Sequence, residues 1–398
     1  MERAIELDLV QRLLDYSRRG RTHEADSIAY NPVSLYTDPD ILAREREVLF
    51  RQRPILVGYA DQLRGAGDYL THELTGVPIL VVRGRDGAVR AFLNVCRHRG
   101  ARVAEGCGTT GRTFICPYHA WSWDTAGKLA GQPDAYGFVD MEDERRSLVA
   151  LPVAEEFGLI WVVPTPGASI DIAAYLAPLA PYLRGHDLAR WTFLHTQDIR
   201  LRMNWKVAVD TFWETYHVPV LHRRTIAPYF DGNRNTFDAL GPHHLMVTTK
   251  QGFQQNQERP QAEWDLLAHA SCLHSVFPNT ALIYLHDHVE IFSCFPDGDN
   301  PDACVVRFEM LIPEPAQDER TAAHWQRNIS IILDVTAEDF TTGEGIQRSF
   351  RSGANEYLSY GTFEAPLAHF HAHHKLALGI PQRRPDRSRA PMATTPAS

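Results

Sequence analysis

Four residues with metal-binding side chains lie in two short pairs within the segment "CRHRGARVAEGCGTTGRTFICPYHAWSWD" (residues 96–124). Cys96 and His98 form the first pair, and Cys116 and His119 form the second. Two thiolates and two imidazoles can bind either a tetrahedral zinc ion or a two-iron cluster. Four metal-ligand residues at paired spacings seldom arise by chance, so this segment is predicted to hold a metal centre.

Three features of the two pairs favour iron over structural zinc. Each pair falls in a short loop between β runs, so two loops can grip a cluster from one end. The stretch "CPYHAW" places a Pro and aromatic residues beside the ligands, where they shield a cluster from water. Each loop also supplies one Cys and one His, and two His on one iron with two Cys on the other is the ligand set of a Rieske [2Fe-2S] centre.

A second candidate metal site lies in "NWKVAVDTFWETYHVPVLH" (residues 204–222), which contains His217 and His222. Ferrous iron that activates O2 typically takes two His and one carboxylate on one face. On an ideal helix these two side chains would point about 140° apart. Pro219 is expected to distort the last turn of a helix predicted over 203–217, which lets His222 swing beside His217. Either His taken alone could be a partly buried core residue.

The first segment closely resembles the C-x-H-R-G…C-P-Y-H-x-W motif of the Rieske non-haem iron oxygenases, in their catalytic α subunits (the aromatic-ring-hydroxylating oxygenases). The stretch "VTAEDFTTGEGIQRSF" (335–350) matches that family's E-D-x4-E-x2-Q-R pattern. The resemblance implies that Asp339 completes the iron site. Asp339 could instead form a helix-capping box with Thr336, and Asp334 and Glu338 are the fallback carboxylates.

The resemblance also implies roles for two acids that precede the first iron His. Glu214 lies three residues before His217, on nearly the same face of the predicted helix. In the family this position bridges the iron His to a Rieske His of the neighbouring subunit; the alternative is an ordinary exposed acid. Asp210 replaces a frequent Asn and is expected to tune the iron surroundings. Ala120 stands where the family usually has Gly, and its methyl group is expected to crowd the backbone near the cluster.

The elements around these residues predict an α+β protein of several parts. Residues 1–50 are predicted as N-terminal helices, 51–165 as an all-β Rieske domain, 166–380 as a catalytic domain, and 381–398 as a disordered tail. The β runs are "PILVGYA", "PILVVRGRDGAVRAFLNV", "TFIC" and "LIWVVP", then "HHLMVTTKQ", "TALIYLH", "VEIFSCFP" and "ACVVRFEMLIP". Two helices are predicted over 318–335 and 337–353. The resemblance implies that the catalytic domain is a curved antiparallel sheet wrapped over helices, the helix-grip (START-like) arrangement.

The composition of the chain limits the cellular environment and the classes of binding partner that can be expected. The chain has 398 residues, a formal charge of -9 and six Cys. The negative charge argues against nucleic acid and anionic membranes, no apolar run is long enough to cross a bilayer, and the few Cys do not make a disulfide scaffold. A cytoplasmic, reduced protein is expected. Cys107 has no obvious partner and is predicted to be structural.

Three further groups of residues each allow two interpretations. The tract "HFHAHH" (369–374) looks metal-binding but is predicted to be a docking helix. His286 and His288 share one face of a predicted strand and either line a pocket or form a polar face. Phe212, Phe277 and Phe292 are plausible pocket walls, although buried aromatics usually belong to the core.

The expected function is a Rieske-type oxygenase component. It would use O2 and external electrons to hydroxylate or demethylate a small aromatic or amine substrate at mononuclear Fe(II). The alternatives are a ring cis-dihydroxylating dioxygenase, a Rieske electron carrier, and a zinc-stabilised ligand-binding protein. No dinucleotide or plant-type ferredoxin fingerprint is present, so electrons from NAD(P)H would arrive through a separate reductase, with or without a ferredoxin. The resemblance also implies a head-to-tail homotrimer.

Overall fold

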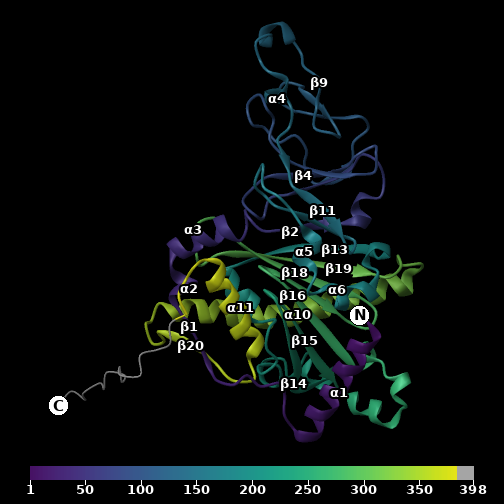
Figure 1. Cartoon of the computed structure of the whole chain (residues 1–398), viewed down its shortest axis with the longest axis vertical. Helices are drawn as coiled ribbons and strands as arrows, with labels where there is room; N and C mark the ends of the chain where they lie inside the picture. Colours follow the sequence, from purple (N-terminus) through teal and green to yellow (C-terminus); the bar gives the residue numbers. More distant parts are fainter. Residues whose placement is uncertain (383–398) are drawn as a thin grey trace, which may run out of the picture.

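The computed structural model describes residues 1–382, so the predicted tail lies outside the described residues except for its first two positions. Figure 1 shows a narrow upper part, built from residues between β2 and β12, on a larger lower part. The N-terminal helices α1 (Arg3–Arg19), α2 (Ser34–Thr37) and α3 (Pro39–Val48) lie against the lower part and the junction. Asp38 caps α3 by accepting a hydrogen bond from the Asp40 backbone N–H at 2.8 Å, as the Asp-Pro start predicts. In the part of the chain described, no helix combines the length and apolar character that a membrane crossing requires.

The upper part consists of three small antiparallel sheets. Their strand orders are β10-β5-β4-β3-β6, β11-β12-β2 and β7-β8-β9. The turn "RDG" (residues 85–87) joins β4 to β5 as an antiparallel hairpin, and its Asp-Gly sequence is typical of such turns. The strands are β2 (Ile55–Tyr59), β3 (Asp68–His72), β4 (Ile79–Arg83), β5 (Val89–Leu93), β6 (Cys107–Thr109), β7 (Thr113–Ile115), β8 (Ser122–Asp124), β9 (Leu129–Gly131), β10 (Ala150–Leu151), β11 (Val153–Glu156) and β12 (Leu159–Val162).

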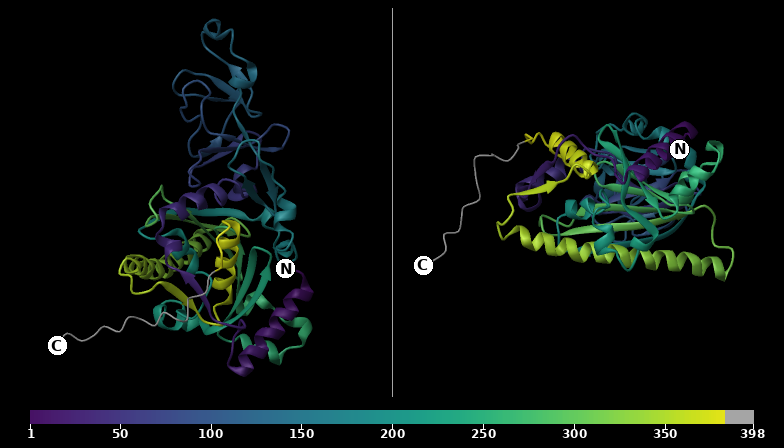
Figure 2. Two further views of the ribbon diagram at one scale, coloured as in Figure 1. Left: turned by 60° about the vertical axis from the view of Figure 1, so that its left-hand side comes forward. Right: turned by 90° about the horizontal axis from the view of Figure 1, so that it is seen from below.

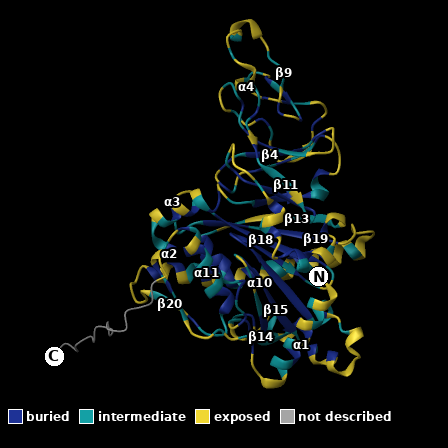
Figure 3. Cartoon of the chain, in the orientation of Figure 1, coloured by how far each residue is buried: buried dark blue, intermediate teal, exposed yellow. Residues whose placement is uncertain are grey.

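The lower part is built on one seven-stranded antiparallel sheet of order β13-β19-β18-β17-β16-β15-β14. Its inner strands are almost wholly buried (Figure 3). The long helix α10 (Glu319–Phe350) runs along one face of this sheet (Figure 2, right). The strands are β13 (Thr192–Leu201), β14 (Phe230–Leu240), β15 (His243–Lys250), β16 (Ala270–Val276), β17 (Thr280–Tyr284), β18 (Val289–Pro296) and β19 (Cys304–Ile312).

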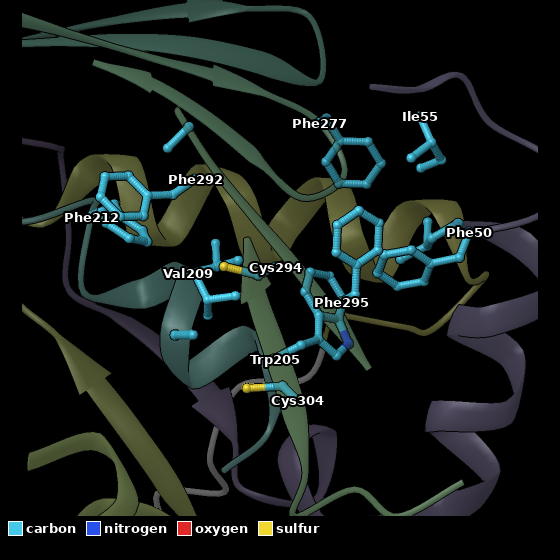
Figure 4. Packing of buried hydrophobic residues seen from close by; sticks show 14 of the residues in the cluster. Phe50, Ile55, Trp205, Val209, Phe212, Phe277, Phe292, Cys294, Phe295 and Cys304 are labelled. Carbon is cyan, nitrogen blue, oxygen red and sulfur yellow. The ribbon is translucent and has the colours of Figure 1, made fainter. Parts of the chain in front are cut away.

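One buried apolar cluster joins the two parts. Phe50, which follows α3, and Ile55, the first residue of β2, pack with Trp205 and Phe295 of the lower part (Figure 4). The rings of Phe50 and Trp205 meet edge to face with centroids 5.2 Å apart. Figure 4 also shows Phe277 beside these residues, whereas Phe212 and Phe292 lie together at the other end. The upper part is therefore packed on the lower part through a shared core.

The helices of the lower part differ from the prediction in two places. The helix predicted over 203–217 is the short α7 (Trp205–Asp210), followed by a non-helical stretch and then α8 (Val218–Leu221). The two helices predicted over 318–335 and 337–353 are the single helix α10, capped by Asp318. Thr336 and Asp339 therefore lie in mid-helix, and the alternative of a capping box there is wrong.

The histidine tract folds as predicted into a docking helix, α11 (Ala365–Ala377). His374 Nε2 lies 2.6 Å from Glu45 Oε1, and Lys206 Nζ lies 2.5 Å from the same oxygen. Burial raises the pKa of Glu45, but Lys206 and His374 outweigh it and lower the pKa to about 2. This buried group fastens α11 to α3 and α7. Near α11, β1 (Ala29–Pro32) pairs with β20 (Tyr357–Tyr360).

Candidate metal centres and substrate cavity

The structure brings His217, His222 and Asp339 together. Their ligand atoms all lie within 4.8 Å of one another, and in the described chain this is the one such group of three. Asp339 Oδ1 lies 3.0 Å from His222 Nε2 and 3.4 Å from His217 Nε2. His217 immediately precedes α8 and His222 immediately follows it, so one short helical turn that contains Pro219 sets both rings. His222 lies beside His217, as expected. However, Pro219 achieves this by lying at the start of a new helix and not by distorting the end of a longer one.

Acids on the outer side of the two rings set which nitrogen faces the group. Glu214 Oε1 contacts His217 Nδ1, and Glu338 Oε2 lies 2.7 Å from His222 Nδ1. Each acid thus holds Nδ1 and leaves Nε2 directed at Asp339, which is how outer carboxylates orient metal-binding His. The prediction that Glu214 shares a helical face with His217 is wrong, because the segment between α7 and α8 is not helical. Glu214 folds back in the turn between α7 and α8, where it also accepts the backbone N–H of His217 at 3.1 Å.

The electrostatics of this group suit a cation. Burial lowers the pKa of His217, but Asp339 and Glu214 outweigh it and raise the pKa to about 10. Burial raises the pKa of Asp339, yet the two His rings hold it below its usual value. Without a metal ion, the His217 ring therefore retains a proton that a metal would replace, whereas Asp339 is ionised. Two imidazoles and one carboxylate on one side fit a mononuclear ferrous ion with open positions opposite.

The other acids predicted near this centre lie elsewhere. Asp334 is exposed on α10 and stands outside the group. Glu338 contacts the outer nitrogen of His222 and so acts as a positioning acid; sequence reasoning missed this role. Asp210 accepts from Tyr36 Oη at 2.6 Å and lies 2.7 Å from His371 Nε2, so its carboxylate engages α2 and α11 and not the three ligands. Its effect on the metal surroundings stays a prediction.

In the upper part, the four Cys and His side chains come from two similar loops. Cys96 and Cys116 are buried, and the rings of His98 and His119 have centroids 4.6 Å apart. Among the residues the structure describes, Nδ1 of each of these His has no hydrogen-bond partner although it is buried. Burial, and the neighbouring Cys116 thiol, raise the pKa of Cys96. Two thiols and two unpartnered ring nitrogens fit a [2Fe-2S] cluster, whose irons would take up these lone pairs.

Both loops are closed by the same backbone hydrogen bonds. The Gly100 N–H donates to the carbonyl of Cys96 at 2.9 Å, and the Ala120 N–H donates to that of Cys116 at 3.1 Å. Gly100 and Ala120 are therefore equivalent positions, and both have positive φ, 79° and 57°. The Ala120 side chain is exposed, and its positive φ brings Cβ close to the backbone carbonyl that follows it, so the expected crowding takes the form of left-handed backbone strain.

The surroundings of the cluster loops are partly aromatic. Trp121, 1% exposed, stacks on the ring of His98 with centroids 5.2 Å apart and an interplanar angle of 8°. Tyr118 lies against His119 but is itself 58% exposed. Trp121 therefore shields one side of the cluster loops, and Tyr118 lies on the surface. Cys107 is exposed in β6, outside this group.

A cavity of about 250 Å³ adjoins the three-ligand group, between the large sheet and α10. Of the three predicted wall residues, Phe212 and Phe292 line it and stack on each other at 4.8 Å, whereas Phe277 belongs to the core. His288 lines the cavity, but His286 is exposed. Both lie in the turn between β17 and β18, so the prediction of one shared strand face is wrong.

Comparisons with known families agree with these two sites. The Rieske [2Fe-2S] domain matches residues 53–141, and the ring hydroxylating alpha subunit (catalytic domain) matches residues 188–378. Those matches contain the two Cys-His loops and the three-ligand group, respectively. The chain therefore belongs to the catalytic α subunits of the Rieske non-haem iron oxygenases, which confirms the family and the fold class predicted from the motifs.

Individual relatives cover parts of the chain. The carnitine monooxygenase oxygenase subunit of Escherichia coli (strain K12) is 34% identical over 200 residues, 48% of this chain and 51% of that protein. The chlorobenzene dioxygenase subunit alpha of Cupriavidus sp. (strain PS12) is 36% identical over 194 residues, 46% of this chain and 42% of that protein. The chain thus matches about half the length of these relatives. A solved quaternary ammonium Rieske monooxygenase, studied for carnitine oxidation and inter-subunit electron transfer, shares the fold with a TM-score of 0.75 at 23% identity, covering 88% of this chain and 95% of that chain.

Proposed function

We propose that this chain is the terminal component of a Rieske-type oxygenase, which uses O2 and external electrons to hydroxylate or demethylate a small aromatic or amine substrate. The observation that carries the proposal is the His217, His222 and Asp339 group at the wall of a mainly apolar cavity. A Rieske electron carrier needs neither the group nor the cavity. When bound, a [2Fe-2S] cluster passes single electrons and a ferrous ion activates O2.

The chain's own residues hold the reacting partners in place. Glu214 and Glu338 fix the orientation of the two His rings, and this keeps Nε2 of each available to a metal. Phe212 and Phe292 offer flat apolar walls that bind substrate and exclude water. The deeply buried Asp339 supplies one negative charge to the site. These roles require no change in the protein fold.

Electron supply is proposed to involve other protein copies. The two Cys-His loops lie in the upper part, away from α10 and the three-ligand group below (Figure 1). Electrons from a cluster in one chain would therefore reach the iron of a neighbouring chain, with Glu214 at the crossing, in a head-to-tail homotrimer. A separate reductase, with or without a ferredoxin, would reduce the cluster with NAD(P)H.

Metal analysis and substitution test the proposal. The purified protein should contain about three irons per chain, two from the cluster and one from the mononuclear site, and should show a Rieske spectrum. His217→Ala and Asp339→Ala should each remove about one iron and abolish turnover while the spectrum persists. Zinc in place of iron, or turnover that survives both substitutions, would overturn the proposal. Product analysis then separates hydroxylation or demethylation from the alternative, cis-dihydroxylation.

A further inference from the structure

The cavity beside the three-ligand group has two chemically different ends. Helix α10 lines its whole length, with Asp339 at the metal end and Asn328 at the remote end. Eleven residues separate them, which corresponds to about 16 Å along a helix. The wall between is apolar and is formed by Leu273, Ile283, Phe292, Ile332 and Val335. A bound molecule that fills the cavity is therefore apolar over most of its length.

Two hydroxyl groups that line the cavity have no partner within the described part of the chain, and the strand register sets them on the side of Leu273 away from the row of Phe292. Thr248 on β15 and Ser271 on β16 are directly opposite each other across the sheet and are 4% and 2% exposed. Neither Oγ1 of Thr248 nor Oγ of Ser271 makes a hydrogen bond, although both residues line the cavity. Buried hydroxyls are normally satisfied. A polar group of a ligand, directly or through water, would satisfy these two.

Glu290 on β18 turns its carboxylate toward the remote end, because it contacts His288, whose ring lies against Trp325 near the start of α10. It is 6% exposed and lines the cavity. Its Oε1 lies 3.3 Å from Nε2 of His288, and Nδ1 of that ring lies 2.8 Å from Asp287 Oδ1. Burial lowers the pKa of His288, but Asp287 and Glu290 outweigh it and raise the pKa to about 9. Both ring N–H groups are thus committed to acids at neutral pH, and neither is left to bind an anion.

The remote end therefore has more acceptors than donors. Glu290 keeps one carboxylate oxygen for a ligand, and the two hydroxyls can each accept or donate. Lys250 is electrostatically coupled to Asp287 and Glu290, but it does not line the cavity. A carboxylate in this place would meet Glu290, a like charge, in a poorly hydrated site. A protonated amine would meet a charged acceptor.

We propose that the remote end of the cavity binds the protonated amine of an otherwise apolar substrate, with Glu290 as the residue that selects for its positive charge. Thr248 and Ser271 supply the second polar contact. The inference rests on the proposed function only in taking this cavity as the substrate site. It narrows that substrate to molecules in which an apolar body separates the amine from the carbon that is oxidised.

Binding to the holoprotein tests the inference without turnover. Dissociation constants are measured anaerobically by calorimetry at pH 7.5 for 4-phenylbutylamine, 4-phenylbutanol and 4-phenylbutyrate, which differ mainly in the head group. The amine should bind most tightly and the carboxylate most weakly. Glu290→Gln should weaken amine binding about 10- to 100-fold, as expected for a hydrogen bond to a charged group, and should change alcohol binding less than about 3-fold.

Further variants separate a specific effect from a general one. Thr248→Val with Ser271→Ala should weaken amine and alcohol alike. Glu309→Gln alters a buried acid of the same sheet that does not line the cavity, and it should leave all three constants unchanged. Tighter binding of the carboxylate than of the amine, or equal losses for amine and alcohol in Glu290→Gln, would overturn the inference. Iron content and spectrum, recorded on the same samples, report independently on the proposed function.

Discussion

Glu309 is predicted to make the protein less stable as the pH rises toward neutrality. This residue of β19 is 7% exposed and accepts a hydrogen bond from Tyr59 Oη at 2.6 Å, across the junction of the two parts. Burial raises its pKa to about 7; Arg307 lowers it in part, but that guanidinium is held by Asp198 through two bonds of 2.7 and 2.9 Å. The carboxyl group is therefore largely uncompensated, and its protonated form is the stable one in the fold.

The sign and size of this pH effect on the free energy of unfolding follow from the difference in the pKa of Glu309 between the folded and unfolded states. An unfolded Glu ionises near pH 4.5, so between about pH 4.5 and 7 the folded state holds a proton that the unfolded state has lost. The free energy of unfolding is then fully retained below pH 4.5, falls through this window, and levels off above pH 7. A difference of about 2.5 pH units corresponds to a loss of about 3 kcal/mol.

Glu309→Gln isolates this contribution, because an amide keeps an acceptor for Tyr59 and does not titrate. Urea midpoints of the holoprotein and the variant, measured from pH 4.5 to 8, should diverge as the pH rises, with the variant about 3 kcal/mol more stable at pH 8. Comparison of the two proteins at each pH cancels the other titrating groups. A difference that stays constant with pH, or that grows toward acid, would refute the reasoning.

Three other substitutions have expected outcomes. Ala120→Gly should raise the free energy of unfolding by about 0.5–1 kcal/mol in urea denaturation, because relief of left-handed strain exceeds the entropy that Gly adds to the unfolded chain; a loss of stability would contradict this. Glu338→Ala should weaken mononuclear iron binding about 10- to 100-fold in a chelator titration with the Rieske spectrum intact, whereas the exposed Asp334→Ala should have no effect. Lys206→Met should lower the free energy of unfolding by about 3 kcal/mol in urea denaturation, because it removes a buried ion-pair partner of Glu45. A decrease below about 1 kcal/mol would argue against a stabilising Lys206–Glu45 pair.

The closeness of the residues within each candidate metal-binding pair is predictable from the sequence because it depends on local spacing, whereas Asp339 was indicated only by the family resemblance. Cys96 and His98 lie in one loop, and the residues on either side of Pro219 share one turn, so neither arrangement needs long-range information. The central strands β17, β18 and β19 are also predictable, because their apolar runs are buried. The edge strands β13 and β14 escape prediction, since an edge strand exposes polar residues along much of its length.

Residues whose roles depend on distant partners were not predictable. Nothing near Asp210 in the sequence indicates that Tyr36 and His371 will hold its carboxylate. The same applies to Ser271, which becomes notable only because Thr248 stands opposite it. The break after α7 was also missed: "DTFWETYH" has an acceptable helical composition, and the hydrogen bonds of Glu214 to the following turn compete with helix continuation.

The unbroken course of α10 gives the cavity a fixed length. Asn328 and Asp339 lie on one continuous helix, so the distance between the two ends of the cavity is fixed. A hinge between two helices would allow that distance to change with the ligand. In a homologous series of ligands anchored at the remote end, each added methylene should advance the chain by one carbon past the metal ligands. The carbon that is oxidised would then lie at a fixed distance from the anchored end of the substrate, and the length of α10 would set that distance.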